Sequence, residues 1–145
     1  MPYLPANNDY VGIDLTRAML ARVPALVPPL ALVQGNTMRL PFADESFDCA
    51  VMHVIVAAVP EPSRCLAEAA RVLKRGGMLL VLDRFLRPGA AAPLRRALNP
   101  IVNSFATRLD VVWEDLLAAV PKIAVQSDEP ALAGGWIRLI RATKL

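Results

Sequence analysis

Residues 11–15 have the sequence VGIDL, an apolar run that ends in an acidic residue and a leucine. An acidic side chain at the carboxyl end of a parallel strand is typical of nucleotide-binding α/β units, where the carboxylate holds a ribose. In such units a glycine-rich loop lies about 20 residues before the acidic residue. Only 13 residues precede Asp14, and Gly12 is the only glycine among them. The sequence therefore predicts the part of a cofactor site that holds the ribose, but not the glycine-rich loop that normally precedes it.

Short apolar runs alternate with helical segments along the chain, which favours an α/β fold built on a mostly parallel, Rossmann-like sheet. Strands are expected at residues 10–14, 31–34, 48–53, 78–83, 123–126 and 136–142. Helices are expected at residues 16–22, 62–74, 93–104 and 111–119. Residues 127–135 are rich in turn formers and should join the last two strands as an antiparallel pair. At 145 residues, the chain is expected to be a single domain, residues 1–145.

The helix expected at residues 62–74 has the clearest local signals. Pro62 suits a first helical turn, and Gly76 and Gly77 are expected to stop the helix. Lys74 and Arg75 would complement the negative end of the helix dipole. One apolar stripe should face the core, formed by Cys65, Leu66, Ala69, Val72 and Leu73.

Composition excludes several classes of protein. No stretch of about 18 apolar residues lacks a charge or a proline, which argues against a membrane span. The net charge of +3 is mild, and no aromatic residues interleave the basic ones as nucleic-acid stacking would require. A solvated basic face is the favoured interpretation, and transient contact with an anionic membrane surface is the weaker one. Cys49 and Cys65 lack metal-ligand spacing and suit thiols of a reducing, cytoplasmic compartment, so no metal is expected.

Three blocks follow residues 11–15 in a specific order. They are Gln34-Gly35-Asn36 with Leu40-Pro41-Phe42, then Phe47-Asp48 opening a strand, then the stretch AARVLKRGGMLLVLD at residues 69–83. Together with GIDL, these blocks resemble the class I S-adenosylmethionine-dependent methyltransferases of the type 11 subgroup. The resemblance is strong over residues 1–89 and loose beyond them. It argues against a second interpretation, a fragment of a dinucleotide-binding oxidoreductase.

The resemblance implies S-adenosylmethionine as the cofactor and assigns roles to particular residues. Asp14 corresponds to the carboxylate that accepts both ribose hydroxyls, and Leu15 and Met38 would flank the adenine. Asn36, followed by Thr37 in the same segment, stands where the family commonly has an aspartate that accepts from the adenine amino group. His53 and Val54 lie where backbone carbonyls face the methionine end of the cofactor. No residue is assigned as catalytic.

Each assignment has a structural alternative. Asp14 could cap the helix that follows it, and Asn36 could be a turn residue. His53, the only histidine, could be a general base, although a lone histidine is more often structural. Asp83 ends a strand at the edge of the sheet where ligands bind, but it could equally pair with Arg84 or Arg87.

The family's GxGxG loop and first strand have no counterpart in this chain. In relatives the segment after that loop resembles residues 1–5, so Met1 is expected to be an internal start or the edge of a shortened product. The missing strand is central in the family, between the strands represented here by residues 10–14 and 48–53. Those two strands would have to pair directly, leave a gap, or borrow a strand from a partner or a second copy.

The sequence thus predicts methyl transfer from S-adenosylmethionine to a small-molecule or lipid acceptor, impaired in a chain without the glycine loop. The alternative from another class is a non-catalytic remnant that binds another protein or forms oligomers. The run VIVAAVPEP at residues 54–62 and the apolar composition are somewhat similar to the phospholipid-headgroup and quinone methyltransferase branches, and the acceptor itself stays open.

Overall fold

The computed structural model describes residues 5, 7–23, 30–86, 111–132 and 136–145. The chain divides into two compact units, Met1–Pro41 and Phe42–Leu145. The helix expected at residues 93–104 lies outside the described residues. In the described part of the chain, no helix has the length and apolar character needed to cross a membrane.

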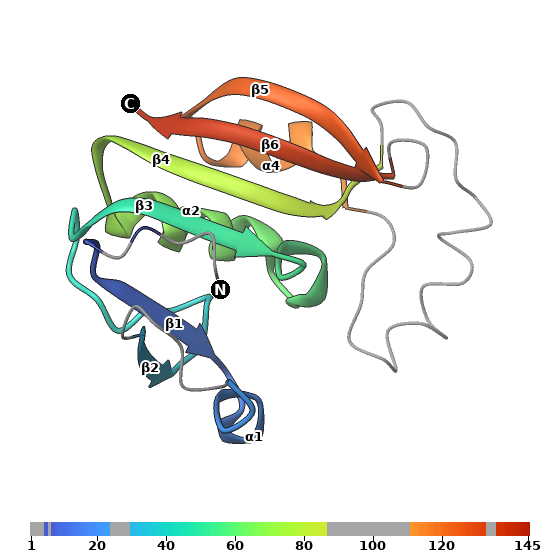
Figure 1. The fold of residues 1–145 in the computed structure, drawn as a ribbon. Helices are drawn as coiled ribbons and strands as arrows, with labels where there is room; N and C mark the ends of the chain where they lie inside the picture. The colour runs from blue at the N-terminus through green and yellow to red at the C-terminus, as the bar shows by residue number, and fades with distance from the viewer. Residues whose placement is uncertain (1–4, 6, 24–29, 87–110, 133–135) are drawn as a thin grey trace. The chain divides into compact units, whose positions relative to one another are not determined.

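In its described residues, the first unit holds two parallel strands and one helical turn. They are β1 (Tyr10–Asp14), α1 (Arg17–Leu20) and β2 (Leu30–Gln34). The register runs from Tyr10 opposite Leu30 to Asp14 opposite Gln34. The carboxyl ends of both strands therefore meet at one edge of this small sheet (Figure 1). The helix is shorter than expected, because after Leu20 the backbone bonds tighten to the i−3 spacing.

The described part of the second unit is a four-stranded mixed sheet with two α-helices and a short 3₁₀ turn. Its elements are β3 (Phe47–His53), the 3₁₀ turn η1 (Val56–Ala58), α2 (Pro62–Val72), β4 (Leu73–Arg84), α4 (Trp113–Ala119), β5 (Ile123–Leu132) and β6 (Ile137–Lys144). The strand order is β3-β4-β6-β5, in which β3 and β4 are parallel and the other two pairs antiparallel. The α/β class and the antiparallel pairing of the last two strands are confirmed.

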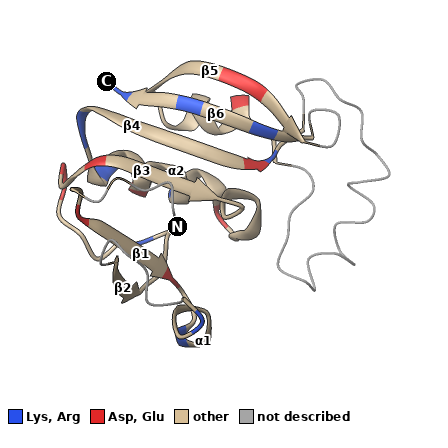
Figure 2. Cartoon of the chain, in the orientation of Figure 1, with Lys and Arg blue, Asp and Glu red and all other residues tan. Residues whose placement is uncertain are grey.

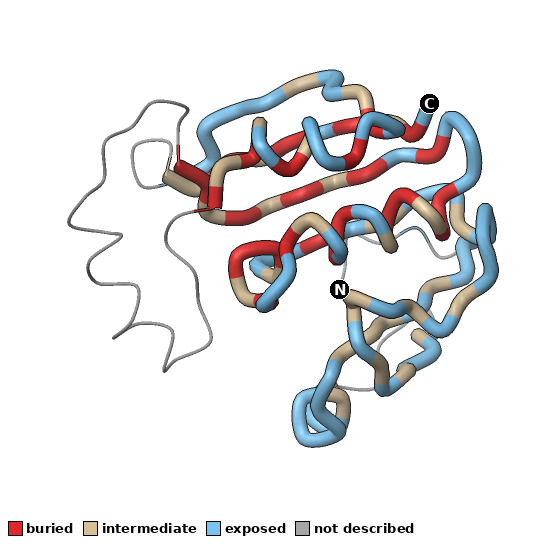
Figure 3. The backbone as a smooth tube through the Cα atoms, turned by 180° about the vertical axis from the view of Figure 1, so that it is seen from behind, coloured by how far each residue is buried: buried red, intermediate tan, exposed pale blue. Residues whose placement is uncertain are grey.

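The core of the second unit lies between the sheet and the helices α2 and α4, which share one face of the sheet (Figure 1). Seen from the helix side, buried residues run along both helices and the strands behind them (Figure 3). The expected apolar stripe of α2 is fully buried and is confirmed: Cys65, Leu66, Ala69, Val72 and Leu73. The rings of Phe85 and Trp113, 5.3 Å apart, close the core beside α4.

The predicted end of α2 is wrong by two residues. The helix stops at Val72 because Leu73 turns into extended backbone and begins β4. The last carbonyls of the helix accept hydrogen bonds from the loop before β3: Glu45 N–H donates to Arg71 O, and Ser46 N–H to Val72 O. Gly76, with φ of +75°, lies inside an irregular stretch of β4 and does not stop the helix.

The predicted loop at residues 127–135 is also wrong over its first six residues, which belong to β5. β5 continues to Leu132 through Pro130, where a central strand would be interrupted. Pro130 is tolerated because β5 is the outer strand of the sheet and is irregular between Pro130 and Leu132. A second irregularity lies between Val125 and Ser127.

The strand pairing decides against one of the three arrangements expected for the strands at residues 10–14 and 48–53. Among the described residues, β1 pairs with β2 and β3 pairs with β4, and the two strands belong to separate sheets. Direct pairing of β1 with β3 is therefore not the arrangement found. Each of the two strands keeps one edge without a strand partner in the described chain.

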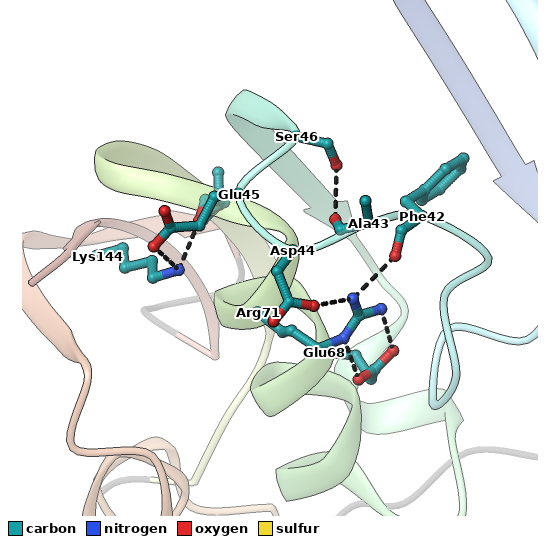
Figure 4. A network of polar contacts seen from close by, with 9 residues as sticks. Phe42, Ala43, Asp44, Glu45, Ser46, Glu68, Arg71 and Lys144 are labelled. Carbon is teal, nitrogen blue, oxygen red and sulfur yellow. Dashed lines mark hydrogen bonds and ion pairs between the residues drawn. The ribbon is translucent and has the colours of Figure 1, made fainter.

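Arg71 holds the loop before β3 against α2 (Figure 4). Its Nε and Nη2 donate to the two carboxylate oxygens of Glu68 at 2.8 and 2.9 Å. Its Nη1 donates to Asp44 Oδ1 at 2.7 Å and to Phe42 O at 2.8 Å. The hydrogen bonds to Glu68 and Asp44 raise the pKa of Arg71 above its ordinary value. The arginine of the RVLK block thus fixes the start of the second unit.

Candidate functional site

Asp14 lies half-buried at the carboxyl end of β1, where the sequence predicts the ribose contact. Its Oδ1 accepts two hydrogen bonds from Thr16, from N–H at 2.7 Å and from the hydroxyl at 2.9 Å. Its Oδ2 has no partner among the described residues. Thr16 occupies the N-cap of α1, but its hydroxyl does not cap the helix. One oxygen thus organises the turn, as the structural alternative suggested, and the other stays available to a ligand.

The side chains expected around the adenine lie at the same edge of the first unit. Gly35 N–H donates to Asp14 O at 3.0 Å, which joins the two strand ends. Asn36 is exposed, and its Oδ1 accepts from Met38 N–H at 2.8 Å. Leu15 is 64% exposed, and Thr37 and Met38 are half-buried. The structure therefore places Asp14 beside the turn that holds Asn36, Thr37 and Met38.

His53 and Val54 belong to the second unit. His53 is the exposed last residue of β3, opposite Leu82 in the register. Val54 N–H donates to Leu82 O at 2.9 Å. Both residues lie at the carboxyl end of the parallel pair β3–β4, the edge at which open α/β sheets bind ligands.

The sequence did not predict two features of this second edge, the backbone conformation of Val54 and the hydrogen-bond partners of Asp83. Val54 has a φ of +52°, a strained conformation for a β-branched residue that is commonest at functional sites. Asp83 is fully buried, and its carboxylate accepts from Ala57 N–H at 3.1 Å and Arg84 N–H at 2.7 Å. It bonds backbone amides and forms no ion pair with the Arg84 side chain in the described chain. In a sequence, a β-branched residue directly after a strand is too weak a signal to predict a strained backbone conformation.

Replacing Val54 by glycine should stabilise the fold. Relief of the strained backbone contributes about 1–3 kcal/mol, and the freedom of glycine in the unfolded chain offsets about 0.5–1 kcal/mol. We expect a net gain of about 1 kcal/mol in the free energy of unfolding, measured by urea denaturation. Val51→Gly is the matched control in the extended part of β3 and should lose about 1 kcal/mol. A loss in both variants would show that Val54 carries no strain.

Other polar clusters in the described chain are limited. A shallow cavity of about 390 Å³ in the first unit is lined by Arg17, Leu20, Ala21, Leu32 and Gln34. It reaches the carboxyl end of β2 at Gln34, opposite Asp14 in the register, but Asp14 does not line it. Within the described ranges, no group of three or more histidine, cysteine or acidic side chains is placed to hold a metal ion. Neither Cys49 nor Cys65 forms a disulfide; Cys49 lies in an exposed position, Cys65 is buried, and partial desolvation raises the pKa of Cys49.

A family model described as a methyltransferase domain matches residues 1–81. That stretch contains β1, β2, β3 and α2 together with the Asp14 edge. The chain belongs to the class I S-adenosylmethionine-dependent methyltransferases. S-adenosylmethionine is the cofactor of this family, and the sequence-based identification of both is confirmed.

Curated relatives of this methyltransferase chain carry lipid and quinone names. A phosphatidylethanolamine N-methyltransferase of Cereibacter sphaeroides is 34% identical over 97% of this chain and 72% of its own length. A demethylmenaquinone methyltransferase of Renibacterium salmoninarum is 33% identical over 87% of this chain. The match covers 46% of that enzyme, so the chain spans less than half of some relatives.

Solved structures support the fold of the methyltransferase chain. The YcgJ protein of Bacillus subtilis covers 94% of this chain with a TM-score of 0.75, at 16% identity over 82% of its own length. A geranyl diphosphate methyltransferase solved in complex with S-adenosylmethionine also covers 94%, with a TM-score of 0.72, at 16% identity over 69% of its own length. At such low identity these likenesses show the fold alone.

Proposed function

We propose that this chain is the methyl-transfer domain of an enzyme acting on a lipid or small-molecule acceptor. The observation that carries the proposal is the Asp14 edge, where a carboxylate with an unpartnered Oδ2 adjoins the exposed Leu15 and the Asn36–Met38 turn. A carboxylate can accept two hydroxyl hydrogen bonds side by side, which suits a ribose diol. The names of the curated relatives favour phosphatidylethanolamine or a demethylated quinone as the acceptor class.

The residues present fit part of the cofactor. Asp14 would hold the ribose, Leu15 and Met38 would flank the adenine, and Asn36 would accept from its amino group. Thr37 would contribute from the same turn, and His53 and Val54 would offer backbone carbonyls to the methionine end. When bound, S-adenosylmethionine supplies an electrophilic sulfonium methyl group. The chain's own task is then to position and desolvate the reacting groups, so no catalytic side chain is obligatory.

The residues of this chain supply no glycine-rich loop for the carboxylate of the cofactor. A glycine-rich loop supplies backbone N–H donors to that kind of group, and no glycine precedes Gly12 in this chain. We therefore propose that this chain binds S-adenosylmethionine weakly and transfers the methyl group poorly. That Cys49 and Cys65 form no disulfide is consistent with a reducing, cytoplasmic compartment, which we propose for this chain.

The second candidate is a non-catalytic role as a protein-binding or oligomerising subunit. The two strand edges of β1 and β3 that have no strand partner in the described chain favour it. A strand from another chain could add to such an edge through main-chain hydrogen bonds.

A transfer assay separates the two candidates. The chain is incubated with methyl-labelled S-adenosylmethionine and vesicles containing phosphatidylethanolamine, or with a demethylated quinone. We expect slow incorporation of label into one acceptor, and still slower incorporation with Asp14→Asn. Equal rates for both proteins would contradict the site at Asp14. Absence of label in both acceptors at high protein concentration would contradict catalysis and favour the non-catalytic role.

A further inference from the structure

Among the described residues of the second unit, helices cover one face of the four-stranded sheet. Both α2 and α4 lie behind the sheet in Figure 1, and the view from the other side shows them in front of it (Figure 3). All-parallel sheets have both faces covered, because their strands are apolar on both sides, and the parallel pair β3–β4 of this mixed sheet is of that apolar kind. The face turned away from α2 and α4 is therefore the unusual surface of this unit.

The strand register defines this open face. Its three cross-strand rows, from β3 through β4 to β6, are Cys49–Met78–Thr143, Val51–Leu80–Arg141 and His53–Leu82–Leu139. Every residue in these rows is exposed or half-buried, and Val51 is 68% exposed. The rows between them, on the helix side, are Ala50–Leu79–Ala142 and Met52–Val81–Ile140, and they are buried apart from the half-buried Ala50. The open face is thus largely apolar and is not a solvated polar surface.

The open face also carries one charge of each sign, one on β6 and one on β5. Arg141 follows Ile140 on β6 and is exposed, at the β6 end of the second row. Glu129 on β5 is exposed and lies opposite Leu139. Neither side chain forms an ion pair or a side-chain hydrogen bond within the described part of the chain. Figure 2 shows the acidic stretch of β5 running beside the basic stretches of β6.

We propose that the open face binds the same face of a second copy of this chain about a two-fold axis. An interface of this kind needs a patch that complements itself, so that each residue type meets its counterpart from the other copy. The apolar rows would pack on one another, and Arg141 of each copy would meet Glu129 of the other. Charges of opposite sign on one patch suit this pairing, whereas an anionic lipid surface would meet Glu129 as a repulsive charge.

The size of the open face makes this dimer weak. Four strands about 4.8 Å apart and about seven residues long at 3.3 Å per residue give roughly 400 Å² per copy. A stable interface usually buries about 800 Å² per partner, and smaller ones are transient. We therefore expect association that depends on protein concentration in the micromolar range, with no permanent dimer.

Sedimentation velocity over a wide range of protein concentration tests the proposal. The unmodified chain should shift from monomer to dimer, and Val51→Lys should shift the dissociation constant upward by at least tenfold. Arg141→Glu and Glu129→Arg should each weaken the dimer at least threefold, and the double variant should restore it. Arg64→Glu, at an exposed position of α2 on the helix side, should change nothing. Circular dichroism checks that every variant is folded.

Several results would overturn the proposal. A monomer at all concentrations would do so, whether the face is covered by residues 87–110 or by solvent. If Val51→Lys and the single charge reversals leave the dissociation constant of the dimer unchanged, the interface lies elsewhere. Failure of the double variant to restore association would reject the Arg141–Glu129 pairing. Binding to anionic vesicles by a chain that stays monomeric would assign the face to a lipid surface.

Discussion

Replacing Arg138 by methionine should lower the free energy of unfolding by about 3 kcal/mol. Arg138 is 8% exposed on β6, and its guanidinium lies between two carboxylates. Nε donates to Asp128 Oδ1 at 2.9 Å, and Nη2 contacts both Asp128 Oδ2 and Glu114 Oε1. The hydrogen bonds to Asp128 raise the pKa of Arg138 above its ordinary value. Methionine keeps the volume but leaves two carboxylates facing each other without a counter-ion.

Urea denaturation followed by tryptophan fluorescence measures this loss, because Trp113 is almost fully buried beside Phe85. Arg141→Met, on the same strand but exposed, should change stability by less than about 0.5 kcal/mol. Adding Glu114→Gln and Asp128→Asn to Arg138→Met should recover most of the stability, since no uncompensated charge then remains. A triple variant as unstable as the single one would show that packing, and not charge, explains the loss.

Asp83→Ala should cost about 3 kcal/mol of stability, for a different reason. The carboxylate of Asp83 is the acceptor for two backbone N–H groups, those of Ala57 and Arg84. Hydrogen bonds to a charged group contribute about 1.5–3 kcal/mol each, and a buried donor left without an acceptor adds a desolvation penalty. Amide hydrogen exchange should show loss of protection at Ala57 in the variant.

Asp83→Asn separates the hydrogen bonds from the volume of the side chain. The amide oxygen of asparagine still accepts, so about half of the stability loss should return. Glu129→Ala, at an exposed carboxylate with no hydrogen bond in the described chain, is the control and should be nearly neutral. Equal losses in the alanine and asparagine variants would contradict a role of Asp83 as an acceptor for Ala57.

The sequence predicts the elements of this fold better than their ends, and α2 shows why. Its apolar stripe is a local pattern and was identified in full. Its last turn is determined by Glu45 and Ser46, which lie more than 20 residues earlier and satisfy the free carbonyls of the helix. A partner so distant in sequence leaves no local signal, so the glycine pair after the helix was mistaken for its end.

The misjudged loop in β5 has a similar cause. Proline is a strong signal for a turn, but its missing N–H matters only where a neighbouring strand needs that donor. Pro130 lies in the outermost strand of the sheet, and only the strand order reveals this. Strand order depends on long-range pairing and could not be read from the composition of residues 127–135.

The candidate site also has features that the local sequence predicts and features that it does not. The position of Asp14 at a strand end follows from the local run VGIDL and was predicted correctly. The hydrogen bonds from Thr16 to one carboxylate oxygen, and the positive φ of Val54, depend on the conformation of short turns. Turn conformations of residues without glycine or proline leave weak sequence signals. The roles of the seven proposed cofactor residues stay predictions until a ligand is measured.

Calorimetric titration with S-adenosylmethionine tests the central claim most directly. Two proteins are compared: the 145-residue chain and the same chain extended at its N-terminus by a strand–GxGxG–helix segment. We predict weak or undetectable binding to the first and clear binding to the second. Asp14→Ala in the extended protein should remove most of the affinity, at about 1.5–3 kcal/mol for each hydrogen bond to the carboxylate. Thr16→Val should spare it, because the carboxylate remains. Low-micromolar binding of S-adenosylmethionine by the 145-residue chain would contradict the account. So would an extended protein whose affinity for S-adenosylmethionine is unchanged by Asp14→Ala.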